Sequence, residues 1–287
     1  MEESLLGHEP LLRLASFLGV FTAMALWEWA APRRRPAWDR RSRWVPNLGI
    51  AAIDTAAIRL LFPAAAVGAA AVASERGWGL FQQGDWSGPL VFLGSLVALD
   101  LAVYLQHVVF HAVPALWRLH LVHHADLDFD VTTGLRFHPL EIVLSMLWKI
   151  GVVVALGAPA AAVLAFEVLL NATSLFNHGN ARIPLRLDRI LRWIVVTPDM
   201  HRVHHSLLRR ETNSNFGFNL PWWDRLLGTY RAQPAAGHAA MTIGIEQLQR
   251  DPPLGLGRLL ALPFRVDPGR YPINRGPDDD TLRLEEV

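Results

Sequence analysis

The sequence predicts an all-α integral membrane protein that carries a histidine-rich site for two metal ions. Hydrophobic residues make up 52% of the 287 residues and charged residues only 18%, which is too apolar for a typical soluble domain. Several apolar runs are long enough to cross a bilayer as helices, which takes about 20 residues. Ten of the twelve histidines fall between His107 and His205.

Charge and cysteine content exclude several classes of protein. The net charge is +1, so a concentrated basic face and a nucleic-acid partner are not expected. The chain contains no cysteine, which excludes disulfides, thiolate zinc sites and cysteine-held iron–sulfur clusters. Any metal ion must therefore be held by nitrogen or oxygen atoms.

The first predicted span covers residues 11–31. It is preceded by three acidic residues and no basic one, whereas a cleavable signal peptide would carry positive charge there; the three are Glu2, Glu3 and Glu9. It is followed by a loop with six arginines, which are Arg33, Arg34, Arg35, Arg40, Arg41 and Arg43. Because positively charged loops stay in the cytoplasm, the loop is predicted to be cytoplasmic and the N-terminus external.

Four further apolar runs complete the predicted bundle. The second and third spans cover residues 50–74 and 88–110. Two shorter runs, 140–156 and 158–176, are separated by Gly157 and Pro159, as in a tight turn between two helices. We interpret them as a helical hairpin with both ends cytoplasmic, which places every group of histidines on the cytoplasmic side.

Residues 184–196 are predicted to form an amphipathic helix. Helical spacing relates Leu187, Ile190, Leu191 and Ile194, and arginines repeat every third residue at Arg186, Arg189 and Arg192. The pattern fits a helix lying in the membrane interface, and it equally fits an ordinary helix that packs its apolar side on the domain.

The histidines are arranged in three compact boxes and two single positions. The boxes are His107-x-x-x-His111, His120-x-x-His123-His124 and His201-x-x-His204-His205, and the single residues are His138 and His178. Positions i, i+3 and i+4 share one face of a helix, so each box directs two or three imidazoles the same way. Ten imidazoles are too many for one ion, which predicts two metal ions. Without a flavin or nicotinamide motif, a redox role favours iron, although zinc can replace iron in purified protein.

Polar residues near the boxes are candidates for supporting roles. Asp100 and Tyr104 share a helical face with His107 and His111, and an ionisable residue inside a span is a functional candidate. We expect the Asp100 carboxylate to support a box histidine; the alternative is a structural hydrogen bond between helices. Weaker candidates are Asp126, Asp128, Glu141, Asn177, Asn180, Asp199, Asn215 and Asp224.

The order and flanks of these motifs resemble the fatty acid hydroxylase and sterol desaturase superfamily, in particular its bacterial members. The resemblance covers roughly residues 88–231. It rests on Asp100-x-x-x-Tyr104-x-x-His107, Leu116-Trp117-Arg118-x-His120-x-x-His123-His124, Arg136-x-His138-Pro139-x-Glu141, Asn177-His178-x-Asn180, Thr197-Pro198-x-x-His201-Arg202-x-His204-His205-Ser206, Asn215-Phe216-Gly217 and Trp223-Asp224-Arg225-Leu226.

The resemblance implies a helical membrane bundle with a cytoplasmic cap that holds a di-metal centre. It implies two iron ions, O2 as co-substrate, an alkyl chain of a bilayer lipid as substrate, and hydroxylation or desaturation as the reaction. Electrons would come from a separate donor protein, and the location would be a bacterial inner membrane. The ten histidines are expected to ligate metal, with catalytic support from Asp100, Tyr104 and Asn180.

Three regions follow from these patterns. Residues 1–87 form an N-terminal transmembrane region with two spans, and residues 88–231 form the fatty acid hydroxylase-like catalytic domain. Residues 232–287 are predicted to be an irregular tail without chemistry, first rich in proline and glycine and then acidic at Asp278, Asp279, Asp280, Glu285 and Glu286.

Two other functions remain open from the residues alone. A zinc-dependent hydrolase of membrane lipids would need a carboxylate base, as in H-E-x-x-H, and that motif is absent. A histidine-rich metal transporter would place its ligands near the middle of the membrane, whereas these boxes lie at the ends of spans and beyond.

Overall fold

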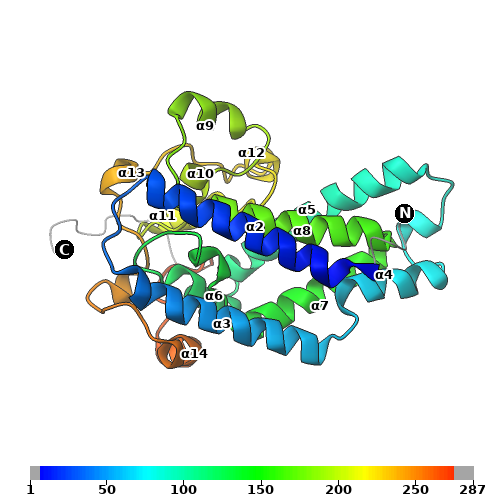
Figure 1. Cartoon of the computed structure of the whole chain (residues 1–287), viewed down its shortest axis with the longest axis horizontal. Helices are drawn as coiled ribbons and strands as arrows, with labels where there is room; N and C mark the ends of the chain where they lie inside the picture. Colours follow the sequence, from blue (N-terminus) through cyan, green and yellow to red (C-terminus); the bar gives the residue numbers. More distant parts are fainter. Residues whose placement is uncertain (1–6, 275–287) are drawn as a thin grey trace.

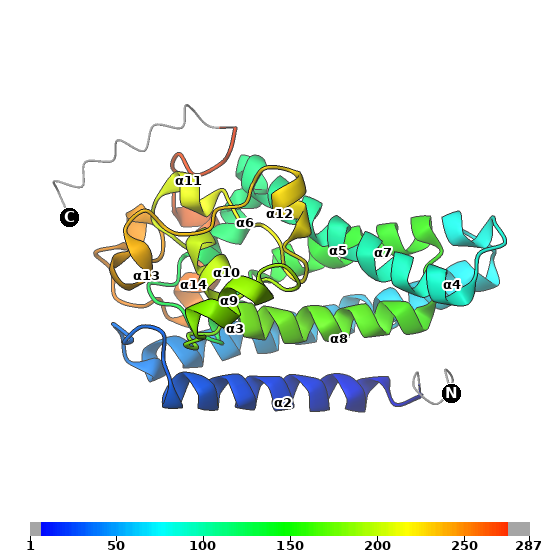
Figure 2. The same cartoon turned by 90° about the horizontal axis from the view of Figure 1, so that it is seen from above.

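The computed structural model describes residues 7–274, and this part of the chain is helical (Figure 1). Six longer helices run along the long axis of the molecule; they are α2 (Glu9–Ala30), α3 (Arg40–Leu61), α4 (Ala65–Glu75), α5 (Gly88–Ala112), α7 (Pro139–Leu156) and α8 (Ala160–Asn177). Shorter helices gather at one end, which we call the cap end (Figure 2); they are α6 (Pro114–His124), α9 (Leu185–Leu191), α10 (Pro198–His204), α11 (Arg209–Thr212), α12 (Trp222–Leu226), α13 (Gly237–Ala240) and α14 (Leu256–Arg265). Three 3₁₀ turns complete the order: η1 (Leu80–Gln82), η2 (Thr133–Leu135) and η3 (Glu246–Leu248).

The predicted apolar runs form membrane-spanning helices. Within the described residues, five helical stretches are long and apolar enough to cross a bilayer, namely Glu9–Ala30, Arg40–Gln82, Gly88–Ala112, Pro139–Leu156 and Ala160–Asn177. Large apolar side chains such as Leu18, Leu93 and Leu147 are exposed on them, as expected of lipid-facing surfaces. The chain is an integral membrane protein.

The second span differs in detail from the prediction. It begins at Arg40, ten residues earlier than expected, because the Asp39 carboxylate caps the helix by accepting from the backbone N–H of Arg41 and Ser42. It is also two helices rather than one, since α3 ends at Leu61 and α4 starts at Ala65 after Pro63, which lacks an N–H donor.

The bundle packs α2 against α8, α3 against α7, and α5 against both α7 and α8. A buried cluster that includes Leu99, Val163 and Phe166 stabilises it by close van der Waals packing between the helices. The predicted tight turn between α7 and α8 is confirmed at Gly157. Its φ is 63°, and an added Cβ would lie 2.5 Å from the carbonyl oxygen of Trp78.

The prediction of an irregular C-terminal tail is wrong for residues 232–274. This segment forms α13, η3 and α14, and Leu248, Leu259 and Tyr271 join Trp117 and Leu121 of α6 in one buried core. The apolar spacing of α14 was the available signal. The acidic positions beyond residue 274, like Glu2 and Glu3, lie outside the described residues.

The predicted amphipathic helix is α9. It is shorter than expected, because it ends at Leu191 and residues 192–194 form turns instead of helix. Its apolar side chains do not pack on the domain. Leu187, Ile190 and Ile194 are exposed, whereas Asp188 and Arg192 are buried as an ion pair with Nε to Oδ2 at 2.7 Å. This excludes the alternative of an ordinary helix that buries its apolar side.

Candidate metal centre

Four elements meet at the cap end and bring the boxes together. The last two turns of α5 carry the first box, and α6 carries the second. His178 follows directly after α8, and α10 with its C-cap residue carries the third box. Pro114 starts α6 immediately after α5, because proline fits the first turn of a helix, and this reversal turns the second box back onto the first.

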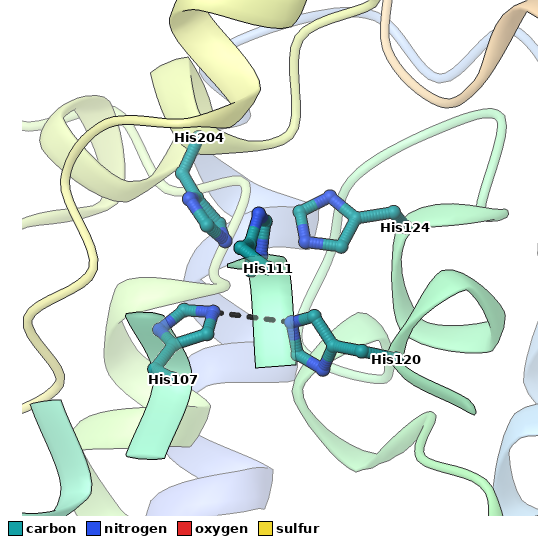
Figure 3. Close-up of side chains that lie close together, drawn as sticks. All are labelled: His107, His111, His120, His124 and His204. Atoms are coloured by element: carbon teal, nitrogen blue, oxygen red, sulfur yellow. Dashed lines mark hydrogen bonds between the residues drawn. The ribbon is translucent and has the colours of Figure 1, made fainter. Parts of the chain in front are cut away.

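The first group consists of five buried histidines from three helices (Figure 3). One ligand atom from each lies within 4.8 Å of every other; the five are His107, His111, His120, His124 and His204. Figure 3 shows the rings arranged around one common space, with the nitrogens of the five imidazoles turned inward. An ion in that space would have imidazole ligands only.

The second group consists of four buried histidines, His123, His178, His201 and His205, with ligand atoms again within 4.8 Å of one another. The two groups adjoin, since the rings of His124 and His205 stack with centroids 4.7 Å apart. No carboxylate joins either group within residues 7–274. The arrangement is therefore a pair of neighbouring all-nitrogen sites.

The rings of the first group are oriented through their Nδ1 atoms. The segment 213–216 serves three of them: the Nδ1 atoms of His107, His111 and His204 lie 2.8, 3.0 and 2.7 Å from the Phe216 carbonyl, the Asn213 side-chain oxygen and the Ser214 carbonyl. The fourth, on His120, lies 2.6 Å from the Glu141 carboxylate. Each Nδ1 therefore carries the proton, which leaves Nε2 as the lone pair available to a metal ion.

The geometry of the free nitrogens fits a metal ion. The Nε2 atoms of His107 and His120 lie 3.1 Å apart. Both carry a lone pair and no proton, because the hydrogen bonds at Nδ1 place the proton on that nitrogen. A proton shared between them is disfavoured, because burial lowers the pKa of His120 to about 3. Among the described residues, the buried Nε2 atoms of His111, His124 and His204 have no hydrogen-bond partner. Neutral imidazoles in this arrangement are ligands suited to iron or zinc.

The second group shows the same features. The Nδ1 atom of His178 donates to the Ser174 carbonyl at 2.7 Å, and its Nε2 lies 3.1 Å from the Nε2 of His123 and 3.0 Å from that of His201. Burial lowers the pKa of His178 to about 3 and holds those of His123 and His201 well below the usual value. These histidines are therefore neutral at physiological pH, which is the form that binds metal.

The structure places His138 outside both groups, so the candidate ligands number nine within the described residues rather than the ten expected. Its Nδ1 accepts from the Leu140 N–H at 3.2 Å and caps α7, and its Nε2 donates to the Leu260 carbonyl at 3.2 Å. Both ring nitrogens are thus engaged by the backbone. The sequence could not separate this histidine from the ligands, because its flanks match the family pattern equally well.

We therefore expect His138→Ala to keep both metal ions and to cost about 1 kcal/mol of stability, the usual effect of losing a helix N-cap. Metal content and thermal unfolding in detergent measure the two quantities together. Loss of one ion per chain in this variant would restore His138 as a ligand.

Asp100 and Tyr104 bond to residues 220–229, which follow the segment 213–216 that orients the histidines, and not to the histidines themselves. Asp100 Oδ2 accepts from Trp223 Nε1 at 2.7 Å and from the Leu220 N–H at 3.3 Å, which corrects the expectation that an imidazole or Tyr104 is its partner. The hydroxyl of Tyr104 lies 2.9 Å from that of Thr229.

The chain of contacts continues from Thr229 to the site. The Thr229 hydroxyl donates to Asp224 at 2.7 Å, and the same carboxylate accepts from the Phe216 and Gly217 N–H groups at 2.8 and 2.9 Å. Phe216 in turn presents its carbonyl to His107. Tyr104 therefore supports the first group through three intervening residues, Thr229, Asp224 and Phe216. Sequence spacing could not reveal this role, since Asp224 lies 120 residues further along the chain.

Asp100→Leu should consequently lower metal affinity or turnover by about 10- to 100-fold, the usual effect of losing support behind a ligand. It leaves the donors of Trp223 and Leu220 unpaired, whereas Asp100→Asn keeps an acceptor oxygen and should retain most of the function. Metal titration of the two variants separates them. Equal behaviour of Asn and Leu at this position would contradict the proposed support.

Asn180 lies away from both groups. Its side chain accepts from the Arg34 N–H at 3.0 Å and donates to the Arg34 carbonyl at 2.8 Å, so it holds the loop after α2. Among the described residues, neither histidine group includes it or bonds to it. The expected catalytic role is not supported by this placement.

A buried ion network behind the second box was not predicted. Arg43 of α3 donates to both carboxylate oxygens of Asp126 at 2.8 Å and to Asp130 at 2.5 Å. Although burial raises the pKa of Asp126, the guanidinium groups of Arg43 and Arg136 outweigh this and hold it well below its usual range. The network fixes the loop that leaves α6 directly after His124.

Several known proteins are similar to this chain in sequence. A sequence model described as fatty acid hydroxylase matches residues 92–229. The chain is 31% identical over 210 residues to the ornithine lipid hydroxylase of Rhizobium tropici, which covers 72% of this chain and 60% of that protein. It is 28% identical over 153 residues to the human alkylglycerol monooxygenase (52% of this chain, 32% of that protein) and 27% over 139 residues to the human cholesterol 25-hydroxylase (47% and 49%). The chain thus spans less than two thirds of these relatives, and no solved structure matches it.

The bundle and the two histidine groups define an integral membrane protein with a candidate di-metal centre built from imidazoles. The matched residues include all nine candidate ligands. This matched region, residues 92–229, belongs to the fatty acid hydroxylase family.

Proposed function

We propose that this protein is a membrane-bound lipid hydroxylase that uses two iron ions, O2 and electrons from a separate donor protein. The observation that carries the proposal is the pair of adjoining groups of buried, neutral imidazoles whose free nitrogens converge. The five-histidine and four-histidine groups would each hold one ion. Bound iron would supply reduction of O2 and oxidation of a C–H bond, chemistry that protein side chains alone cannot perform.

The protein's own part is to hold the imidazoles and to keep water away from them. Phenylalanine rings surround the histidines: the ring of Phe137 stacks on His123 with centroids 4.4 Å apart, and Phe218 lies 5.2 Å from His107. An apolar lining disfavours protonated imidazoles and would keep water from intercepting a reactive oxidant.

The proposed substrate is the alkyl chain of a bilayer lipid. The three relatives named above are, by their names, enzymes of an ornithine lipid, an alkylglycerol and cholesterol, all of which are membrane lipids. An integral membrane protein with its candidate site at the end of the spans can receive such a molecule directly from the bilayer.

Two contacts argue against the alternative functions. The Glu141 carboxylate accepts from Nδ1 of His120, the ring nitrogen opposite the one left free for a metal ion. It is therefore not placed as the base that a zinc hydrolase would need. His107 and His111 lie in the last two turns of α5, not in a broken helix near its middle, where a transporter would hold its ion.

Isotope labelling of lipids tests the proposal. A host that expresses the gene should contain a lipid with one additional oxygen atom, and that atom should be labelled when the cells grow under ¹⁸O₂. A host with the His204→Ala variant is the matched control. Cleaved lipid that takes its label from H₂¹⁸O would instead indicate a hydrolase, and an unlabelled lipid that has lost two hydrogens would indicate a desaturase.

We also propose that the histidine groups face the cytoplasm. The arginine-rich loop after α2 contacts the cap, since Arg33 Nε lies 3.0 Å from Asp199 on α10. Positive loops stay cytoplasmic, so the cap at the same end of the bundle would be cytoplasmic too.

Cysteine labelling checks this topology, because the chain has no cysteine of its own. We expect Asp85→Cys, in the exposed turn before α5, to react with an impermeant maleimide in intact cells. Arg258→Cys, in α14 of the cap, should react only after permeabilisation. The reverse pattern would contradict a cytoplasmic cap.

A further inference from the structure

Two short cap helices, and the turn that follows the first of them, present large apolar side chains that remain largely exposed in the described chain. Six of them are between 42% and 73% exposed: Leu185 64%, Ile190 61%, Trp193 61%, Ile194 63%, Trp222 42% and Leu226 73%. We call these six residues the α9–α12 band. A soluble surface rarely exposes so many large apolar groups together, and such a patch usually marks an interaction site.

The band is held together as one unit. The indole N–H of Trp222 donates to the Trp193 carbonyl at 2.8 Å, so the start of α12 is fixed to the turn that follows α9. The Arg225 guanidinium lies 4.0 Å from the centroid of the Trp193 ring and donates to the Arg192 carbonyl at 3.1 Å. These contacts hold the exposed side chains of the band in fixed positions.

Along the direction of the spans, the band lies beside the helices and not beyond their ends. At one end, Ala181 pairs with Pro32, just beyond the last residue of α2. At the other end, Trp223 and Leu220 bond to Asp100, which lies 12 residues before the Ala112 end of α5, or about 18 Å along the helix. Figure 1 shows α9 and α12 standing out from the side of the bundle at the cap end.

The chemistry of the band matches the boundary of a lipid bilayer. Tryptophan is enriched where membrane meets water, and two of the six residues are Trp. Arg182, Arg186 and Arg189 are exposed on or next to α9, where they can reach anionic head groups. A second copy of the chain fits less well, because symmetric contact would bring these like charges together.

We propose that the α9–α12 band inserts into the membrane leaflet on the cap side and anchors the cap against the bilayer. The inference rests on the membrane location of the spans and not on lipid oxidation. Insertion would also link the bilayer to the candidate metal centre. The segment 216–226 carries the Phe216 carbonyl, which bonds to His107, at one end and the inserted Leu226 side chain at the other.

Spin labels at single cysteines test the insertion in the full-length protein. Nitroxides at Ile190→Cys and Leu226→Cys, in nanodiscs of mixed neutral and anionic phospholipid, should collide far more with O2 than with a water-soluble nickel chelate. Leu93→Cys on the lipid-facing side of α5 is the positive control, and Arg258→Cys in α14 is the aqueous control.

Two results would overturn the proposal. Collision with the nickel chelate at both band positions, equal to that at residue 258, would place the band in water. Spin–spin broadening that disappears when labelled protein is diluted with unlabelled protein would show that a second copy covers the band. Since neither readout depends on turnover, an inactive preparation leaves the test intact.

Discussion

Replacing His204 by alanine should remove one of two metal ions and abolish activity. His204 contributes one of the five imidazoles of the first group, and its Nδ1 is already held by the Ser214 carbonyl, so its Nε2 has no other role in the described structure. His123→Ala should remove the other ion, because His123 belongs to the four-histidine group. We expect each affected site to lose at least about 100-fold in affinity, more than is typical for a residue behind a ligand.

The pair of variants has a built-in control. His138→Ala removes a histidine from the same cap without touching either group and should keep both ions. Metal content per chain, measured after loading and desalting, distinguishes the three proteins. Two ions retained in both His204→Ala and His123→Ala would contradict the assignment of ligands.

Arg43→Ala should destabilise the protein by about 3–5 kcal/mol, because it removes the guanidinium that pairs with two buried carboxylates. Arg43 is 1% exposed and bonds to Asp126 and Asp130, which are themselves buried. The loop that these contacts fix follows directly after His124, so metal loss should accompany unfolding and not precede it.

Thermal unfolding in detergent, followed by circular dichroism, measures this effect. Arg41→Ala is the matched control, since Arg41 is an exposed arginine two residues earlier in the same helix. A shift no larger than that of the control would show that the network contributes nothing to stability.

Much of the metal centre could be predicted from the sequence because helical spacing determines where imidazoles point. The division into two groups follows the same rule. His120 and His124, four residues apart, lie about 40° apart around the helix and enter one group, whereas His123 points to the other. The third box repeats this with His201 and His205 in one group and His204 in the other.

The contacts that orient the ligands could not be predicted in this way. Three Nδ1 atoms are held by the segment 213–216, two of them through backbone carbonyls, which every residue possesses. Asp100 was recognised as important from its place in a span, but its partner Trp223 lies 123 residues away. In the sequence, Arg43 is one of six arginines after the first span that indicate the cytoplasmic side, and only the fold shows that it is buried.

The proline and glycine content of the C-terminal region predicts irregular structure, whereas its described part forms helices that pack on α6. Proline can occupy such segments without loss of packing, and Tyr271 stacks on Trp117 with ring centroids 5.7 Å apart. Trp117 in turn lies 4.6 Å from His111, so this region contributes to the wall of the five-histidine group.

X-ray absorption combined with metal counting tests the central claim most directly. Purified wild-type protein loaded with iron or zinc should bind two ions per chain. Its absorption spectrum should show a nitrogen and oxygen shell at about 2.0–2.2 Å, with the scattering pattern of imidazole rings. Saturation at one ion per chain, or a metal shell without imidazole scattering, would contradict a di-metal centre held by the two histidine groups.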